Sequence, residues 1–475
     1  MTAVLDTAPP PRQGSGSVSL GLPLGEGRRL LGRMTLAPRP KGGRGKLTHY
    51  QRQSGFTLIE VVVATLITIE VILAALALFD FHNRLARVQG QVTDMQQSLR
   101  AAQYEMVKLT RMAGRGGLPA VLHASQPNQA YGAVGVRNNV TSGADQIAIG
   151  FSNSPKAVDG TDILILRGAF SLPILTLDPS GPGKLVLTGG TGTPATATSG
   201  TVIVCALTPT NIAQDIGSLS SAVSAALLAG QVEPLVLVGS RSDADYAVVE
   251  LNPAASVLTG TQPGCPAPGA GVKIAFTVTG DVNANAFQQL GAVTGTFGLP
   301  PLMNAVATLG VLEEYRYYIR KDTTPNALGD PVMHLSRARM YPGTETPYYN
   351  TSTNLQVDVA DNLVDLQVAL GVDTNGDGLI TEGGTGSPPS TLPPTTTDEW
   401  IYNVTGDPPF PVTSPLLEVR INTIAITGNP DPQYQGPKLT QVEDHTYVAT
   451  DFPNTFHGRC YRHRLLTTVV GLRNL

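Results

Sequence analysis

The sequence is poor in the residues that most often carry chemistry. It has 475 residues but only three cysteines and one tryptophan, and just 14% of its side chains are charged. It contains no G-x-S-x-G turn, no phosphate-binding loop and no H-E-x-x-H pair. These absences argue against the common hydrolase, nucleotide-binding and zinc-protease classes, so we expect the protein not to be an enzyme.

Basic charge is scarce outside the N-terminus. Residues 1–55 carry nine Lys/Arg and two Asp/Glu, whereas the rest of the chain carries 23 basic and 34 acidic residues. Nucleic-acid phosphates are bound by clustered Lys and Arg, so this acidic body argues against a nucleic-acid partner.

In an exported domain, Cys205 and Cys265 could form a disulfide and leave Cys460 free, although spacing alone does not fix that pairing.

One long apolar run is present, from residue 56 to residue 79. Its polar members are Thr57, Glu60, Thr65, Thr68 and Glu70. About 20 mostly apolar residues are enough for a helix to span a bilayer. The preceding stretch, residues 34–55, holds five basic residues and no acidic one. By the positive-inside rule this flank stays in the cytoplasm, and the large C-terminal part is translocated.

Two simpler interpretations compete with a functional span. A cleaved secretory signal has an apolar region of about 7–15 residues, and Ala75-Leu76-Ala77 imitates its cleavage site. This run is longer, however, and it contains two glutamates. A plain membrane anchor is the other alternative, and it leaves Glu60 unexplained.

Glu60 lies near the cytoplasmic edge of the span. An ionisable side chain within the bilayer costs roughly 2.5–3.5 kcal/mol unless it finds a partner. Cleavage after Gly55 would turn the nitrogen of Phe56 into an ammonium at the same depth. In a helical filament, Glu60 of one subunit could pair with the Phe56 ammonium of a neighbour, which would neutralise both charges and set the register between subunits.

The string GFTLIE, residues 55–60, resembles the processing site of type IV prepilins. That resemblance implies a prepilin peptidase that cleaves after Gly55 and N-methylates Phe56. Glu70 departs from the family pattern, and it would be either protonated or paired with a partner subunit. The leader of 55 residues is long for the family, and its first 33 residues are predicted to be disordered or to result from an upstream start-site error. A start at Met34 would leave a compact basic leader.

Four patches of the remaining chain resemble PilW-like minor pilins. They are GTDILILRG at 160–168, EYRYYIRKD at 314–322, LVDLQVALGVDTNGDG at 363–378 and VVGLRN at 469–474. The resemblance implies an inner-membrane protein with a periplasmic head, which later joins a pilus and helps to assemble or prime it near the tip. Its implied partners are the peptidase, other major and minor pilins, the inner-membrane assembly platform, and membrane lipid before assembly.

Two other functions stay open. A pseudopilin of a type II secretion system would share the same helix. A tip adhesin would use a large insertion, which we place at about 179–300 because it lies outside the patches that resemble minor pilins.

The fold class predicted is α+β. Apolar residues spaced by three and four between Leu85 and Leu109 predict that the helix continues as an amphipathic segment over 80–113. The glycines at 114, 116 and 117 should end it. Residues 118–475 predict a mostly antiparallel, pilin-like β head, with a flexible linker at 383–397.

Short Val/Ile-rich segments between Gly, Pro, Asn and Asp turns predict the strands of the head. They are 146–151, 162–167, 184–188, 201–206, 234–238, 246–251, 272–279, 312–320, 332–340, 417–426 and 466–472. One further helix is predicted at 211–228.

One segment of the head has the pattern of a calcium loop. Asp373, Asn375 and Asp377 stand at positions 1, 3 and 5, and a glycine follows at position 6. The carbonyl of Leu379, the side chain of Thr381 and the carboxylate of Glu382 could add oxygens, or Asp365 or Asp398 could close the shell. Position 12 is Gly384 rather than the glutamate of an EF-hand. The alternative is an Asx turn, in which these side chains bind local amides.

Overall fold

The structure is a computed structural model. It describes residues 55–116, 118, 132–141, 157–170, 306–342, 356–381, 398–403, 415–448, 454 and 459–472. Within these ranges, residues 323, 327, 341, 432, 433 and 435 are excepted. Between residues 175 and 303 it describes the strands alone. Several parts of the sequence prediction lie outside these residues. They are the strand at 146–151, the helix at 211–228, the linker 383–397, Cys265, Glu382 and the leader before Gly55.

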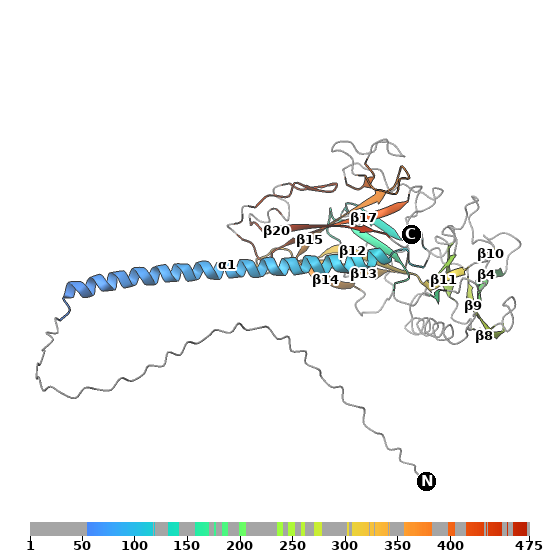
Figure 1. The fold of residues 1–475 in the computed structure, drawn as a ribbon, viewed down its shortest axis with the longest axis horizontal. Helices are drawn as coiled ribbons and strands as arrows, with labels where there is room; N and C mark the ends of the chain where they lie inside the picture. Colours follow the sequence, from blue (N-terminus) through green and yellow to red (C-terminus); the bar gives the residue numbers. More distant parts are fainter. Residues whose placement is uncertain are drawn as a thin grey trace, which may run out of the picture. The chain divides into compact units, whose positions relative to one another are not determined.

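A long helix, α1, runs from Leu58 to Met112. Its 55 residues correspond to about 82 Å at the usual rise per residue. It ends where Gly114 and Gly116 adopt φ angles of +76° and +106°, which L side chains rarely adopt. There the N–H of Gly114 donates to the carbonyl of Arg167 at 3.0 Å. The predicted long helix and its end at the glycines are confirmed (Figure 1).

The chain divides into two units, residues 1–74 and 75–475, and the division falls within α1. In the first unit every large apolar side chain from Phe56 to Leu73 that the structure describes is exposed, by 47–84%. This helix is long and apolar enough to cross a membrane. Large contiguous apolar surfaces of this kind are typical of segments that contact a membrane or another protein.

In the second unit, the C-terminal half of α1 helps to form the main core of the head. Its buried residues are Met95, Leu99, Ala102, Gln103, Met106, Leu109 and Thr110. The side chains of the predicted apolar stripe are therefore buried from Met95 onward, whereas Leu85 is 42% exposed. Two buried positions, Gln103 and Thr110, are polar and were not part of the predicted stripe.

The strands form antiparallel sheets. The first is β1-β2-β12-β13-β14 and the second is β16-β15-β17-β20. Their bounds are β1 Val134–Arg137, β2 Ile163–Gly168, β12 Glu313–Lys321, β13 Met333–Met340, β14 Gln356–Asp361, β15 Leu363–Val372, β16 Trp400–Ile401, β17 Leu416–Ile426 and β20 His463–Gly471. A hairpin joins β18 Gln441–Val442 to β19 His445–Thr446. The structure is thus a mixed α+β fold with one long helix and antiparallel sheets.

The chain passes from the first of these sheets to the second at a single residue. Asn362 lies between β14 and β15 and adopts a φ of +59°. Its N–H donates to the carbonyl of Met333 at 2.8 Å, and its carbonyl accepts from the N–H of Ile426 at 2.9 Å. Asparagine tolerates this left-handed conformation better than most residues.

A third sheet of nine strands comes from the chain between Leu175 and Val311. Its strands are β3 Leu175–Thr176, β4 Gly183–Thr188, β5 Ser199–Cys205, β6 Leu235–Ser240, β7 Tyr246–Leu251, β8 Leu258–Thr261, β9 Ala270–Thr277, β10 Leu302–Met303 and β11 Val306–Val311. It overlaps the predicted insertion at 179–300.

Candidate functional site

The first turn of α1 is closed by a reciprocal pair of hydrogen bonds between Thr57 and Glu60. The N–H and hydroxyl of Thr57 both donate to Oε2 of Glu60 at 2.9 Å, and the N–H of Glu60 lies 3.4 Å from the hydroxyl of Thr57. Thr57 is the N-cap and Glu60 is three residues later, so the pair is a capping box. The sequence T-x-x-E contains this signal, which our sequence analysis missed.

The residues around the expected cleavage point are open to their surroundings. Phe56 is 82% exposed, and a Cβ added to Gly55 would meet nothing within 4 Å. Among the residues that the structure describes, Glu60 hydrogen-bonds only with Thr57, through one carboxylate oxygen. The other oxygen, Oε1, has no hydrogen-bond partner among these residues.

The loop predicted to bind calcium follows β15, and its side chains bind the backbone of the loop itself. The two oxygens of Asp373 accept from the N–H groups of Gly376 and Gly378 at 2.6 and 2.9 Å. Asn375 accepts from the N–H of Asp377 at 2.7 Å, and Asp377 accepts from the N–H of Leu379 at 2.8 Å. These bonds are those of the Asx-turn alternative.

The acid that does reach this loop is Glu399, which precedes β16. Its Oε1 accepts the N–H and the hydroxyl of Thr374 at 3.0 Å, and its Oε2 accepts the N–H of Thr381 at 2.9 Å. Asp398 instead binds the N–H of Trp400, and Asp365 binds Gln367. Nothing local in the sequence indicated Glu399, because residues 382–397 separate it from the loop.

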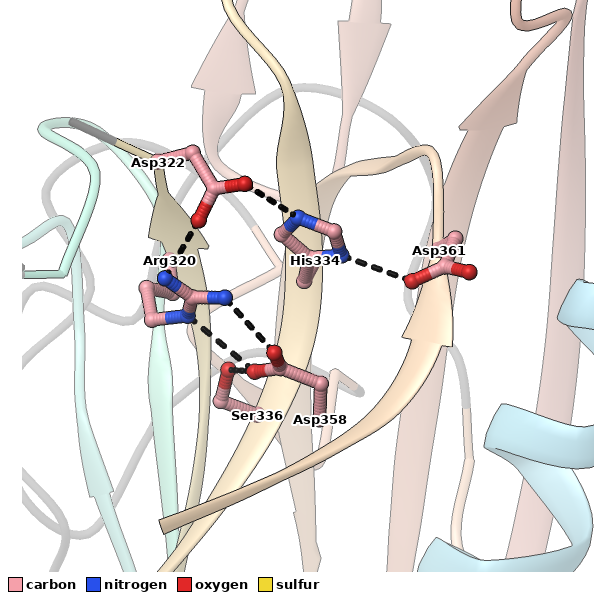
Figure 2. Close-up of polar contacts among 6 residues, drawn as sticks. All are labelled: Arg320, Asp322, His334, Ser336, Asp358 and Asp361. Carbon is pink, nitrogen blue, oxygen red and sulfur yellow. Dashed lines mark hydrogen bonds and ion pairs between the residues drawn. The ribbon is translucent and has the colours of Figure 1, made fainter. Parts of the chain in front are cut away.

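A charged cluster lies across β12, β13 and β14 (Figure 2). Arg320 donates to Asp358 at 2.6 Å and to Asp322 at 2.5 Å. His334 lies between Asp361 at 2.7 Å and Asp322 at 3.1 Å. Burial alone would raise the pKa of Asp358, but hydrogen bonds from Arg320 and Ser336 outweigh it and lower that pKa. This set of cross-strand ion pairs joins three strands.

A second polar cluster is buried where β2, β15 and the β18–β19 hairpin approach. Asp162 accepts the N–H of Val368 at 2.7 Å, Asp365 accepts the hydroxyl of Tyr447, and Asp444 accepts the amide of Asn139 at 2.8 Å. Burial raises the pKa of all three carboxyl groups. His445 lies beside them and favours the charged form of Asp365 and Asp444.

Neither cluster resembles a metal centre. Within the described part of the chain, no group of three or more His, Cys, Asp or Glu side chains is placed to hold a metal ion. Of the cysteines, Cys460 is free and half-buried. Cys205 ends β5, and the predicted pairing with Cys265 falls outside the described residues.

Comparisons with protein-family models, with curated proteins and with solved structures find no match to this chain.

Proposed function

We propose that this protein is a minor pilin of the type IV class, which takes part in pilus assembly or priming near the filament tip after its leader is removed. The proposal rests mainly on one combination: the GFTLIE string lies between a basic flank and an exposed apolar helix. A membrane anchor needs the helix and the flank. It does not need the glycine, phenylalanine and glutamate at these positions.

The surroundings of Gly55 support processing at this residue. A Cβ added at this position would meet nothing within 4 Å. The fold of this chain therefore does not require glycine there. A requirement imposed by an external enzyme explains the residue better, because a peptidase that binds the chain in an extended conformation can exclude any side chain at the cleavage point.

The geometry of Glu60 supports the assembly step. Oε2 caps the helix, whereas Oε1 is free to accept from the ammonium of Phe56 on a neighbouring subunit. Charge-assisted hydrogen bonds are roughly twice as strong as neutral ones. In the bilayer, an unpaired Glu60 carboxylate costs free energy because it lies in an apolar environment. Assembly supplies the positively charged partner and removes this cost.

The alternatives share this N-terminal mechanism and differ in what the head does. A pseudopilin would assemble in a secretion system, and the genes next to its own would encode secretion components. A tip adhesin would use the separate nine-stranded sheet, so deletion of residues 179–300 would abolish attachment and leave filaments intact. Loss of the filaments themselves would count against the adhesin.

The proposal is tested by replacing Glu60 with glutamine and measuring the subunit's incorporation into filaments. We expect at least tenfold less Glu60→Gln subunit in sheared filaments, at unchanged membrane levels, because the neighbouring ammonium loses its counter-charge. Glu70→Gln is the matched comparison, since it removes the other carboxylate of the apolar run. A protonated Glu70 predicts normal incorporation of this variant, whereas a Glu70 paired with a partner subunit predicts a loss. Normal incorporation of Glu60→Gln would contradict the proposed pairing.

Calcium binding by the loop at 373–381 stays a separate proposal. The ligand types are suitable for a hard cation. A bound ion would share these oxygens with the backbone N–H groups that they already accept. The segment 373–381 holds only two carboxylates, so weak affinity is expected.

A further inference from the structure

A groove of about 990 Å³ lies beside α1 immediately after the apolar run. One wall is the helix itself, from Ala77 to Gln91. The other is formed by the segment Asn429, Pro430 and Asp431 together with Arg462. The helix residues on the groove recur at spacings of three and four, so they lie on one face. Both walls belong to the unit formed by residues 75–475.

The groove carries one uncompensated positive charge. It contains three arginines and two aspartates. Arg84 pairs with Asp80 at 2.8 Å, and Arg462 pairs with Asp431 at 2.7 Å. Arg87 is exposed and, among the residues that the structure describes, has no ion-pair or hydrogen-bond partner. A ligand with a single negative charge would balance it.

The distance of these arginines from the end of the apolar run indicates which kind of anion they would bind. Arg84 and Arg87 follow Phe79 by five and eight residues, or about 8 and 12 Å. The polar layer on each side of a bilayer is about 5–8 Å thick. Side chains on a helix lean toward its N-terminus, which is the membrane side here, so both guanidinium groups can reach back into that layer.

The apolar part of the groove fits the same ligand. Ala77, Phe81, Leu85 and Val88 line it, and Phe81 and Leu85 are 61% and 42% exposed. A ligand that carries one negative charge next to hydrocarbon would match both the arginine and this apolar stripe.

We propose that the groove binds the phosphodiester headgroup of an anionic phospholipid, with the phosphate at Arg87 and the first acyl carbons against Phe81. The inference rests on the proposed function in one respect, which is that residues 56–79 are embedded in a bilayer before assembly. A bound lipid fixes the height of the head above the membrane until the subunit enters a filament.

The test uses the full chain in zwitterionic detergent, titrated with short-chain phosphatidylglycerol or phosphatidylcholine, with bound lipids counted by native mass spectrometry. We expect phosphatidylglycerol to bind more tightly. Arg87→Gln should weaken it about fivefold, which corresponds to ~1 kcal/mol for one basic residue at an anionic surface. Arg87→Lys should retain most of the binding. Arg100→Gln is the control, because it removes an exposed arginine of the same helix farther from the membrane.

Equal affinity for the two lipids, or equal losses in Arg87→Gln and Arg100→Gln, would overturn the inference. Displacement of the lipid by millimolar inorganic phosphate would also overturn it, because the site would then bind free anions rather than a headgroup. Filament incorporation, measured separately, distinguishes the two proposals. Normal incorporation without lipid selectivity removes only the lipid site, whereas lipid selectivity without incorporation removes only the assembly function.

Discussion

The amide of Gln103 donates to the hydroxyl of Thr423 at 3.0 Å and thereby joins the buried face of α1 to β17. The same amide lies 3.2 Å from the carbonyl of Leu466 in β20. Two residues later, Glu105 forms an ion pair with Arg337 of β13. The helix is therefore fixed to both sheets by specific polar contacts as well as by its apolar residues.

Replacing Gln103 with leucine should destabilise the head by about 1–3 kcal/mol, because buried acceptors on β17 and β20 lose their donor. The measurement is urea denaturation of the full chain in detergent, followed by the fluorescence of Trp400. Gln97→Leu is the control, since Gln97 is an exposed residue of the same helix. Equal midpoints for the two variants would show that the contact contributes nothing.

Replacing Glu314 with alanine should be more damaging. Glu314 is fully buried on β12 and accepts from Arg167 at 2.7 Å and from Arg316 at 2.6 Å. Its loss leaves buried guanidinium groups without this partner, and breaking such a pair typically costs about 3–5 kcal/mol. Asp322→Asn, which alters the more exposed pairs of Figure 2, should cost less than about 1 kcal/mol. The reverse order of the two denaturation midpoints would contradict this assignment.

The stability of the head should depend on pH in a direction set by its buried acids. The pKa values of Asp162, Asp365 and Asp444 are raised above 3.8 by burial. The folded state therefore holds protons that the unfolded state has released. Stability from these groups is complete below pH 3.8 and is lost as the pH rises through their folded pKa values. Asp358 has a lowered pKa and acts in the opposite direction, since its contribution is lost as the pH falls below 3.8.

Thermal melting between pH 4 and pH 8 checks this expectation. The melting temperature of Asp365→Asn should fall less steeply with rising pH than that of the native chain, because one of the titrating groups is removed. Asp358→Asn should leave the slope in this range unchanged. An identical slope for Asp365→Asn and the native chain would mean that Asp365 has the same pKa in the folded and unfolded states.

The loop after β15 allows the calcium proposal to be separated from a purely structural role. Asp373 is buried and accepts two backbone N–H groups, so Asp373→Ala should lower stability by about 1–3 kcal/mol even in EDTA. Asp377→Ala, at an exposed position, should cost less. Calcium binding would add a melting-temperature increase that depends on the ion and is abolished in both variants. Equal melting of the native chain with and without calcium would exclude the metal site.

The elements that follow a simple periodic pattern could be predicted from the sequence. The long helix was predictable from its apolar run, its stripe and its terminal glycines. Strands such as β7, β12, β13 and β17 were predictable from their β-branched and aromatic residues between turn residues. In each case a local pattern determines the local structure.

β15 was missed as a strand, and its residues explain why. Asp365 and Gln367 interrupt its apolar pattern, yet both are buried, because Tyr447 and the carbonyl of Gly160 supply partners from distant segments. The cluster in Figure 2 was missed for the same reason, since its ion pairs depend on the register between three strands.

The capping function of Glu60 could have been predicted from the local T-x-x-E pattern. Its proposed partner on a neighbouring subunit lies outside a single chain and stays a prediction.

On the function proposed above, the chain is cut after Gly55 and enters a filament by its new N-terminus. Mass spectrometry of the protein purified from cells that contain a prepilin peptidase tests it most directly. We expect N-methylated Phe56 as the first residue. An intact leader, or an N-terminus created after Ala77 by a signal peptidase, would contradict it.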